Sequence, residues 1–214
     1  MGVRPFGFAA AILLAAAIEI VPLSTPSIPA ASASCPAAEV VFARGREEPP
    51  GVGYIGSAFV SALQNKVQVP VGSYGVDYPA DVDPAKGAND MSAHVQSMAK
   101  HCPNTREVLG GYSLGAISAD LVIAVANPAF GFGNPLPPGA EQHVAAVALF
   151  GNGTRRVLGS VPEFSPAFAA KTIDQCAPGD PICSSGTNWP SHLQPSYLGS
   201  GLVDQAATFA AGRI

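Results

Sequence analysis

Short apolar runs alternate along this chain with segments in which apolar residues recur at helical spacing. The runs that predict strands lie at 39–43, 67–78, 106–109, 144–150 and 171–174. The segments that predict helices lie at 53–64, 85–100, 114–125 and 202–211. Since strands and helices alternate, we expect an α/β fold with about five mostly parallel strands, covered by helices on both faces.

The segments between these elements predict loops. Residues 79–84, 127–139 and 151–166 are rich in Gly, Pro or polar residues, and we expect them to be mostly loop. The strand at 144–150 is continuously apolar, which is typical of a strand buried on both faces. With 214 residues the chain suits one domain, and so small a sheet leaves little material for a lid.

The N-terminus has the parts of a secretory signal peptide. Arg4 precedes an apolar run at 6–18, and the segment ends on the small residues 31–33, Ala-Ser-Ala. A signal peptidase requires such small residues, so we expect cleavage after Ala33 and a secreted mature domain at 34–214. The apolar run is short for a bilayer span, and an uncleaved membrane anchor is the alternative.

The four cysteines agree with export to an oxidising compartment, where an even set forms disulfides. Three pairings are possible. Cys176 and Cys183 flank a turn-rich stretch that a local bridge would close, which would leave Cys35 to reach Cys102. A zinc site is the alternative, but the spacings lack a Cys-x-x-Cys unit, so we expect no metal.

The charge of the chain excludes one class of function. The formal net charge is −4, only 12% of the residues are charged, and the eleven Lys and Arg residues are scattered. Proteins that bind nucleic acid gather basic side chains into a patch or stripe. We therefore expect no nucleic-acid partner.

The candidate nucleophile lies in the segment 110–116, which reads Gly-Gly-Tyr-Ser-Leu-Gly-Ala. Gly111-x-Ser113-x-Gly115 matches the nucleophile-elbow pattern and stands between a predicted strand and a predicted helix. The turn requires these glycines because a Cβ there would collide with the neighbouring strand and helix. The pattern can arise by chance among 23 glycines, but its flanking elements favour a true elbow. The N–H of Leu114 would then point to a forming oxyanion.

A serine hydroxyl needs a base, and His192 is the best candidate. In a fold with a nucleophile elbow the chain order is serine, then acid, then histidine. His94 and His101 precede the elbow, and His143 lies at the start of the next strand. Only His192, in a loop before the last helix, leaves room for an acid between it and Ser113.

The acid that orients this histidine has five candidates. They are Asp120, Glu141, Glu163, Asp174 and Asp180. Asp120 lies along the elbow helix and faces away from the active end. Asp180 lies in the loop after the last strand, where a carboxylate can turn back toward the imidazole and a disulfide would fix it. We therefore predict Asp180 as the acid, with Asp174 as the alternative.

Several motifs in order resemble the cutinases, most of all the cutinase-like secreted proteins of mycobacteria. They are Ala43-Arg44-Gly45, the elbow at 110–116, Phe150-Gly151, Cys176-x-x-Gly179-Asp180-x-x-Cys183 and His192. The resemblance covers residues 35–214. It implies a small lidless α/β-hydrolase with the triad Ser113, Asp180 and His192, and the bridges Cys35–Cys102 and Cys176–Cys183. It also implies an oxyanion hole formed by the backbone N–H groups of Arg46 and Leu114.

Two residues depart from the family pattern. Arg46 stands where the cutinases usually carry Ser or Thr, and Leu114 stands where their elbow usually carries Gln. Neither change removes a backbone N–H, so we expect weakened or retuned activity rather than none. The same two residues are the only support for an alternative function, a secreted envelope or surface binding protein that keeps the fold but has lost efficient catalysis.

The predicted reaction is hydrolysis of carboxylic esters through an acyl-enzyme, without a cofactor. The substrate would be a small-molecule or lipid ester with a short to medium acyl chain. We expect Ile182 and Trp189 to form the wall of a shallow apolar groove beside the serine. A monomer in peripheral contact with cell-envelope lipids is the expected state of the mature protein.

Overall fold

The computed structural model of this protein describes residues 1–3 and 35–214. Apart from residues 1–3, the predicted signal peptide and its cleavage point after Ala33 lie outside the described residues. Within those two stretches, no helix combines the length and the apolar character needed to cross a bilayer.

The core of the domain is a five-stranded, wholly parallel sheet with the strand order β2-β1-β3-β4-β5. The strands are β1 (Ala38–Ala43), β2 (Val71–Gly75), β3 (Arg106–Tyr112), β4 (Val144–Phe150) and β5 (Thr172–Gln175). Strand β4 is buried along its whole length, as its continuous apolar sequence predicts. The predicted α/β class and sheet are confirmed.

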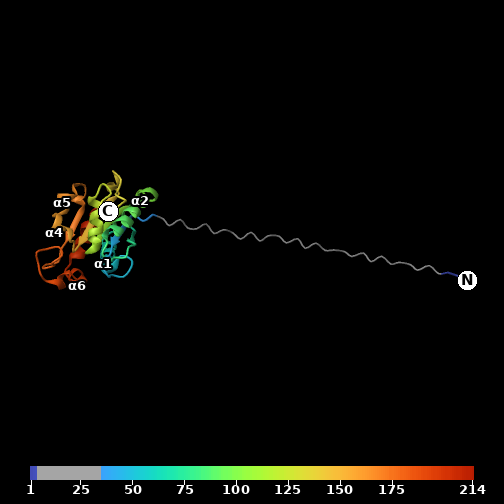
Figure 1. The fold of residues 1–214 in the computed structure, drawn as a ribbon, viewed down its shortest axis with the longest axis horizontal. Helices are drawn as coiled ribbons and strands as arrows, with labels where there is room; N and C mark the ends of the chain where they lie inside the picture. The colour runs from blue at the N-terminus through green and yellow to red at the C-terminus, as the bar shows by residue number, and fades with distance from the viewer. Residues whose placement is uncertain (4–34) are drawn as a thin grey trace. The chain divides into compact units, whose positions relative to one another are not determined.

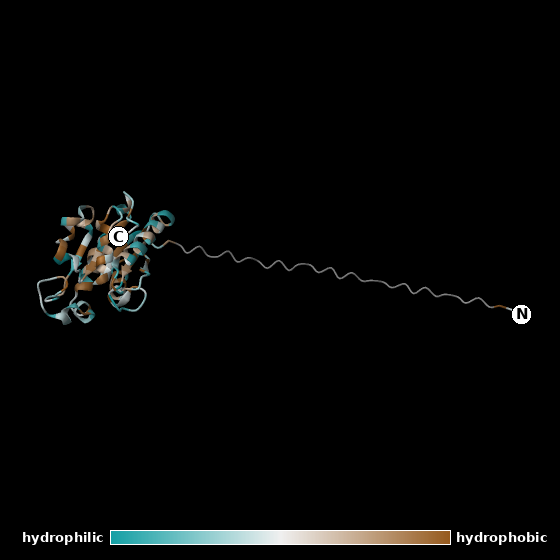
Figure 2. Cartoon of the chain, in the orientation of Figure 1, coloured by the Kyte–Doolittle hydropathy of each residue, from teal (hydrophilic) through white to brown (hydrophobic). Residues whose placement is uncertain are grey.

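Four helices cover the two faces of the sheet (Figure 1). They are α1 (Gly53–Gln64) and α7 (Leu202–Ala211) on one face, and α2 (Pro84–His101) and α3 (Leu114–Ala124) on the other. Alternate residues of each strand point to opposite faces of the sheet. Val41 and Leu109 pack beneath α2 and α3, whereas Val40 and Val108 pack beneath α1 and α7. In Figure 2 the hydrophobic colour is accordingly concentrated in the interior of the domain.

Two segments differ from their predicted structure. Strand β2 begins at Val71 rather than at residue 67, because residues 65–70 form a turn that ends in Pro70, which cannot donate to the ladder. The segment 151–166, predicted as mostly loop, contains α4 (Thr154–Leu158) and α5 (Val161–Phe164). Helices of four or five residues are too short to show a helical period in the sequence.

The remaining described elements are short. They are the 3₁₀ turns η1 (Ala140–Gln142), η2 (Pro166–Lys171) and η3 (Trp189–His192), and helix α6 (Gln194–Leu198). Since all five strands are parallel, their carboxyl ends meet at one edge of the sheet. The loop between β5 and η3 begins at the carboxyl end of β5 and therefore lies at this edge (Figure 1).

Both expected disulfides are present. The Cys35–Cys102 bridge joins the start of the domain to the end of α2, and it spans 67 residues. The Cys176–Cys183 bridge closes a loop of 7 residues directly after β5. The short bridge encloses Asp180, so it restricts the backbone that carries this carboxylate.

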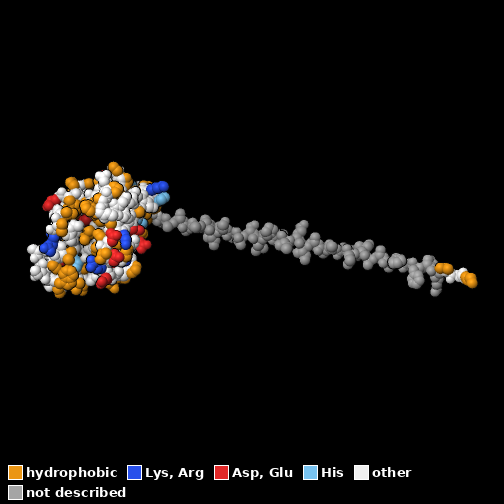
Figure 3. Space-filling view, viewed as in Figure 1, with side chains coloured by type: hydrophobic (Ala, Val, Ile, Leu, Met, Phe, Trp, Pro, Cys, Tyr) orange, Lys and Arg blue, Asp and Glu red, His pale blue; other side chains and the backbone are white. Residues whose placement is uncertain are grey.

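Charged side chains are dispersed over the surface. On the face that Figure 3 shows, basic and acidic side chains are interspersed. This distribution agrees with the scattered basic residues of the sequence and offers no single-sign stripe on that face for a polyanion.

Candidate active site

Ser113 lies in a strained turn between β3 and α3. Its φ of 53° and ψ of −115° fall outside the usual regions for a residue with a side chain. A Cβ at Gly111 would lie closer than 3.0 Å to the backbone of Gly115, and one at Gly115 would collide with the Ala43 carbonyl. Both flanking positions therefore admit only glycine, as the elbow pattern requires.

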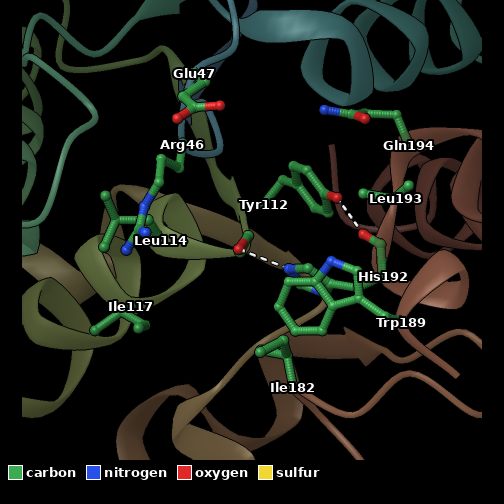
Figure 4. A pocket seen from close by; sticks show the side chains of 11 residues that line it. Arg46, Glu47, Tyr112, Leu114, Ile117, Ile182, Trp189, His192, Leu193 and Gln194 are labelled. Carbon is green, nitrogen blue, oxygen red and sulfur yellow. Dashed lines mark hydrogen bonds between the residues drawn. The ribbon is translucent and has the colours of Figure 1, made fainter. Parts of the chain in front are cut away.

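Ser113, His192 and Asp180 form one chain of hydrogen bonds, of which Figure 4 shows the bond between Ser113 and His192. The Ser113 Oγ lies 2.8 Å from His192 Nε2, and His192 Nδ1 lies 2.8 Å from Asp180 Oδ2. Since a carboxylate only accepts, Nδ1 carries the proton and Nε2 is left to accept the serine O–H. Asp180 is fully buried and His192 nearly so, which keeps competing water from the bond between them.

Two tyrosines that the sequence analysis did not single out hold this chain in place. The buried hydroxyl of Tyr197 donates to Asp180 Oδ2, and that of Tyr112 donates to the carbonyl oxygen of His192. Burial raises the pKa of both hydroxyls well above the usual value, so they stay protonated and donate. The Ile182 N–H also donates to the second oxygen of Asp180, over 2.7 Å. The carboxylate thus accepts from three donors.

The loop after β1 faces Ser113 and carries Arg46. It is held by Glu48, whose buried carboxylate accepts the N–H of Gly45 over 2.7 Å and that of Tyr54 over 2.9 Å. The buried guanidinium of Arg44 donates to three carbonyl oxygens, those of Glu48, Val76 and Tyr78. This anchoring fixes the backbone of Arg46 beside the nucleophile. The sequence signal was the run of charged residues at 44–48, directly after an apolar strand.

A cavity of about 400 Å³ opens over the serine. Its lining combines Ser113 and His192 with both predicted oxyanion-hole residues and both predicted wall residues. The full lining is Arg46, Glu47, Tyr112, Ser113, Leu114, Ile117, Ile182, Trp189, His192, Leu193 and Gln194. The ring of Trp189 lies 5.6 Å from that of His192 and is 56% exposed, so it forms part of the rim.

Comparison with known proteins identifies the family of this chain. Residues 34–214 match the Cutinase family. The chain belongs to the cutinase family. It is 54% identical to the probable carboxylesterase Culp2 of Mycobacterium tuberculosis, over 96% of this chain and 94% of that protein. It is 53% identical to the phospholipase Culp4 of the same organism, over 90% of this chain and 85% of that protein. Membership of this family classes the chain as an ester hydrolase.

Solved structures of a cutinase and of an acetyl xylan esterase share the fold. A Trichoderma reesei cutinase bound to a phosphonate inhibitor is 30% identical, with a TM-score of 0.66 over 83% of this chain and 76% of that one. An acetyl xylan esterase is 26% identical, with a TM-score of 0.71 over 84% of this chain and 99% of that one. The resemblance inferred from the motifs is thus confirmed.

The alternative acid, Asp174, lies apart from the histidine in this cutinase-family member. It belongs to a buried polar cluster with Asp120, Asn152 and Thr154, and it forms no hydrogen bond with His192 in the described part of the chain. Burial raises the pKa of Asp120 to about 7 and that of Asp174 to about 6. Among the described residues, Asp174 therefore lacks the contact through which an acid would orient His192.

One group of described residues has donor atoms close enough to hold a metal ion. The candidate ligand atoms of Cys176, Asp180 and Cys183 lie within 4.8 Å of one another. However, the two sulfurs are bonded to each other at 2.05 Å, and Asp180 is engaged by His192. A disulfide offers no thiolate, so this group does not suit a metal ion.

Proposed function

We propose that this protein is a secreted serine esterase that hydrolyses carboxylic esters through an acyl-enzyme. The observation that carries the proposal is the hydrogen-bonded chain from Ser113 through His192 to Asp180, opening into a cavity on the sheet's carboxyl edge. Two bonds of 2.8 Å with a buried terminal carboxylate are the arrangement that activates a serine hydroxyl.

In the first half of the reaction, Ser113 Oγ attacks the ester carbonyl carbon while His192 Nε2 accepts the serine proton. Asp180 stabilises the imidazolium that forms. The carbonyl oxygen becomes an oxyanion, and the backbone N–H groups of Arg46 and Leu114 donate to it. Neither N–H makes a hydrogen bond among the described residues, so both are free for this role.

In the second half, the tetrahedral intermediate collapses and His192 gives its proton to the departing alkoxide. A water molecule then attacks the acyl carbon while His192 accepts its proton. The bond from Ser113 Oγ to the acyl carbon breaks, His192 returns the proton to Ser113 Oγ, and the carboxylic acid leaves. Every transferred proton passes through Nε2. The other ring proton must therefore stay on Nδ1, in its hydrogen bond with Asp180. The Tyr197 hydroxyl and the Ile182 N–H support this by holding the carboxylate in its orientation toward the imidazole.

The relatives named carboxylesterase and phospholipase suggest acyl esters, including those of lipids, as the substrate class. An open cavity beside exposed Trp189 suits a substrate presented at the edge of a lipid surface. Two disulfides agree with a secreted protein, in line with a signal peptide at 1–33. We infer a monomer that contacts the cell envelope peripherally.

Hydrolysis of p-nitrophenyl esters by the oxidised protein tests the proposal, with Ser113→Ala as the matched control. The wild type should turn over the butyrate ester, and the variant should lose at least about 10⁴-fold in kcat. Equal turnover by the two proteins would show that Ser113 is not the nucleophile.

The rival function, a surface binding protein with weakened catalysis, is favoured by one observation. The side chains of Arg46 and Leu114 add no hydroxyl or amide donor beside the serine. A fluorophosphonate probe separates the two, because only an activated serine reacts with it. Labelling of the wild type but not of Ser113→Ala would support the esterase, and a folded wild type without labelling would support the binding protein.

A further inference from the structure

A second apolar compartment adjoins the catalytic cavity. It has a volume of about 700 Å³, in the range of ligand sites, and its lining is almost wholly apolar. It is lined by Ile117, Phe130, Gly153, Thr154, Arg156, Val157, Leu158, Pro181 and Ile182. Two of these residues, Ile117 and Ile182, also line the catalytic cavity, so the two spaces adjoin at these side chains.

The few polar groups around this compartment are already engaged. The Arg156 guanidinium donates to the Pro181 carbonyl over 2.6 Å, and the Thr154 hydroxyl bonds with Asp120 and Asn152. A purely apolar ligand would therefore leave no buried donor without a partner. The rim, in contrast, exposes large apolar side chains, with Phe130 87% and Val157 80% exposed.

The catalytic cavity itself has two unlike ends. Arg46, Glu47 and Gln194 lie at one end in Figure 4, and Ile117 and Ile182 lie at the other. An ester held at Ser113 would direct its polar alcohol part to the charged end and its acyl part to the isoleucines. The acyl part then points toward the second compartment.

Gly153 lines the second compartment beside both of the shared isoleucines. A Cβ at Gly153 would lie 3.5 Å from Ile182 Cγ2 and 3.8 Å from Ile117 Cδ1, which is ordinary contact distance. The φ of −70° at Gly153 is open to any residue, so the backbone does not require glycine here. A larger side chain at position 153 would extend between Ile117 and Ile182, whereas glycine leaves the space between them open.

We propose that the second compartment is a distal acyl site, which takes the far end of a long acyl chain whose ester group lies at Ser113. This inference rests on the proposed esterase function. It extends the substrate class from the short and medium chains expected from the sequence to long-chain esters. Ile117, Gly153 and Ile182 then form the junction that sets how far a chain can extend.

The substitution Gly153→Leu closes the junction, and Gly153→Ala is its matched control. The measurement is kcat/KM for the p-nitrophenyl butyrate and laurate esters. We expect Gly153→Leu to lower the laurate-to-butyrate ratio about 50-fold, because each of three displaced methylenes weakens binding about fourfold. Gly153→Ala should keep the ratio within about twofold. An unchanged ratio in Gly153→Leu would overturn the distal site.

Adsorption to lipid aggregates gives the opposite sign, which separates it from the proposal. Gly153→Leu adds apolar surface, so adsorption would raise laurate turnover rather than lower it. Val157→Asp at the rim should lower the ratio, whereas Leu198→Asp, an exposed residue of α6 outside both cavities, should not. The distal site is wrong if both aspartate variants lower the laurate-to-butyrate ratio equally. It is also wrong if Val157→Asp acts only by dissociating a dimer of this chain.

A binding measurement keeps the inference testable without catalysis. Trp189, the single tryptophan of the chain, lines the catalytic cavity, so its fluorescence reports on ligands there. In the Ser113→Ala background, dodecanoate should bind at least about tenfold more weakly when Gly153→Leu is added, and butyrate should not. A wild type without esterase activity would refute the proposed function, whereas equal dodecanoate binding by both proteins would refute the distal site.

Discussion

Glu107 on β3 provides the sharpest test of the physical reasoning, because it is a carboxyl buried without a partner. Its side chain is 1% exposed, and neither oxygen has a hydrogen-bond partner in the described part of the chain. It lies at the amino end of the sheet, next to Glu39 in the register of β1 and β3, far from the catalytic edge. Burial, and then the charge of Glu39, raises its pKa from 4.5 to about 8.

The direction of the effect follows from the raised pKa. A carboxyl that is harder to ionise in the folded state stabilises the fold fully below pH 4.5, and this contribution is lost as the pH rises to about 8. A pKa raised from 4.5 to about 8 corresponds to a loss of about 5 kcal/mol. Glu107→Gln keeps the shape and stays neutral, so it should not suffer this loss.

Urea unfolding followed by circular dichroism at pH 5, 7 and 9 measures the effect. At pH 5 the variant should lie within about 1 kcal/mol of the wild type, since both side chains are neutral. At pH 9 it should be the more stable protein, by up to about 5 kcal/mol. Glu163→Gln, an exposed residue of α5, is the control and should change neither value. The same pH dependence in wild type and Glu107→Gln would refute the burial argument.

Three further predictions concern the site. Tyr197→Phe should lower kcat about tenfold with little change in KM, since Asp180 loses a charge-assisted hydrogen bond, and the pH profile of kcat measures the loss. Glu48→Gln should cost about 1–3 kcal/mol in urea unfolding and lower kcat, because the amide oxygen can accept only one of the two loop N–H groups and the amide NH2 cannot accept the other. Replacing Cys176 and Cys183 together with Ala should cost about 2.5 kcal/mol of unfolding free energy in thermal denaturation.

Each of these has an outcome that contradicts it. A Tyr197→Phe protein with the wild-type kcat at every pH would show that the hydroxyl is dispensable. Should Glu48→Gln raise KM alone, the loop would serve substrate binding rather than the oxyanion. For the cysteines, a double variant that melts with the wild type would mean that the closed loop adds no stability.

The parts that the sequence predicted are those with a local physical cause. Gly111 and Gly115 are required by contacts within one turn, so the elbow can be recognised from five residues. The continuous apolar run of β4 likewise indicates, without other information, that this strand is buried on both faces. His192 followed from chain order, since a base must come late enough to leave room for the acid.

The parts that escaped prediction depend on packing between distant segments. The sequence does not reveal that Tyr197 reaches Asp180, because 17 residues and a disulfide loop separate them. Glu107 reads as an ordinary charged residue near the start of a strand, and only the packing around it makes it buried. Helix α4 is a single turn, and the apolar compartment beside it depends on side chains from four separate segments.

The Cys176–Cys183 bridge around Asp180 ties the candidate chemistry to the redox state of the chain. In a reducing cytoplasm these thiols stay apart, and the loop that carries Asp180 lacks its covalent closure. We therefore expect the reduced protein to be a poorer esterase than the oxidised one, which a comparison of the two forms would measure. For the secreted esterase proposed above, hydrolytic activity would therefore depend on the compartment in which this bridge forms.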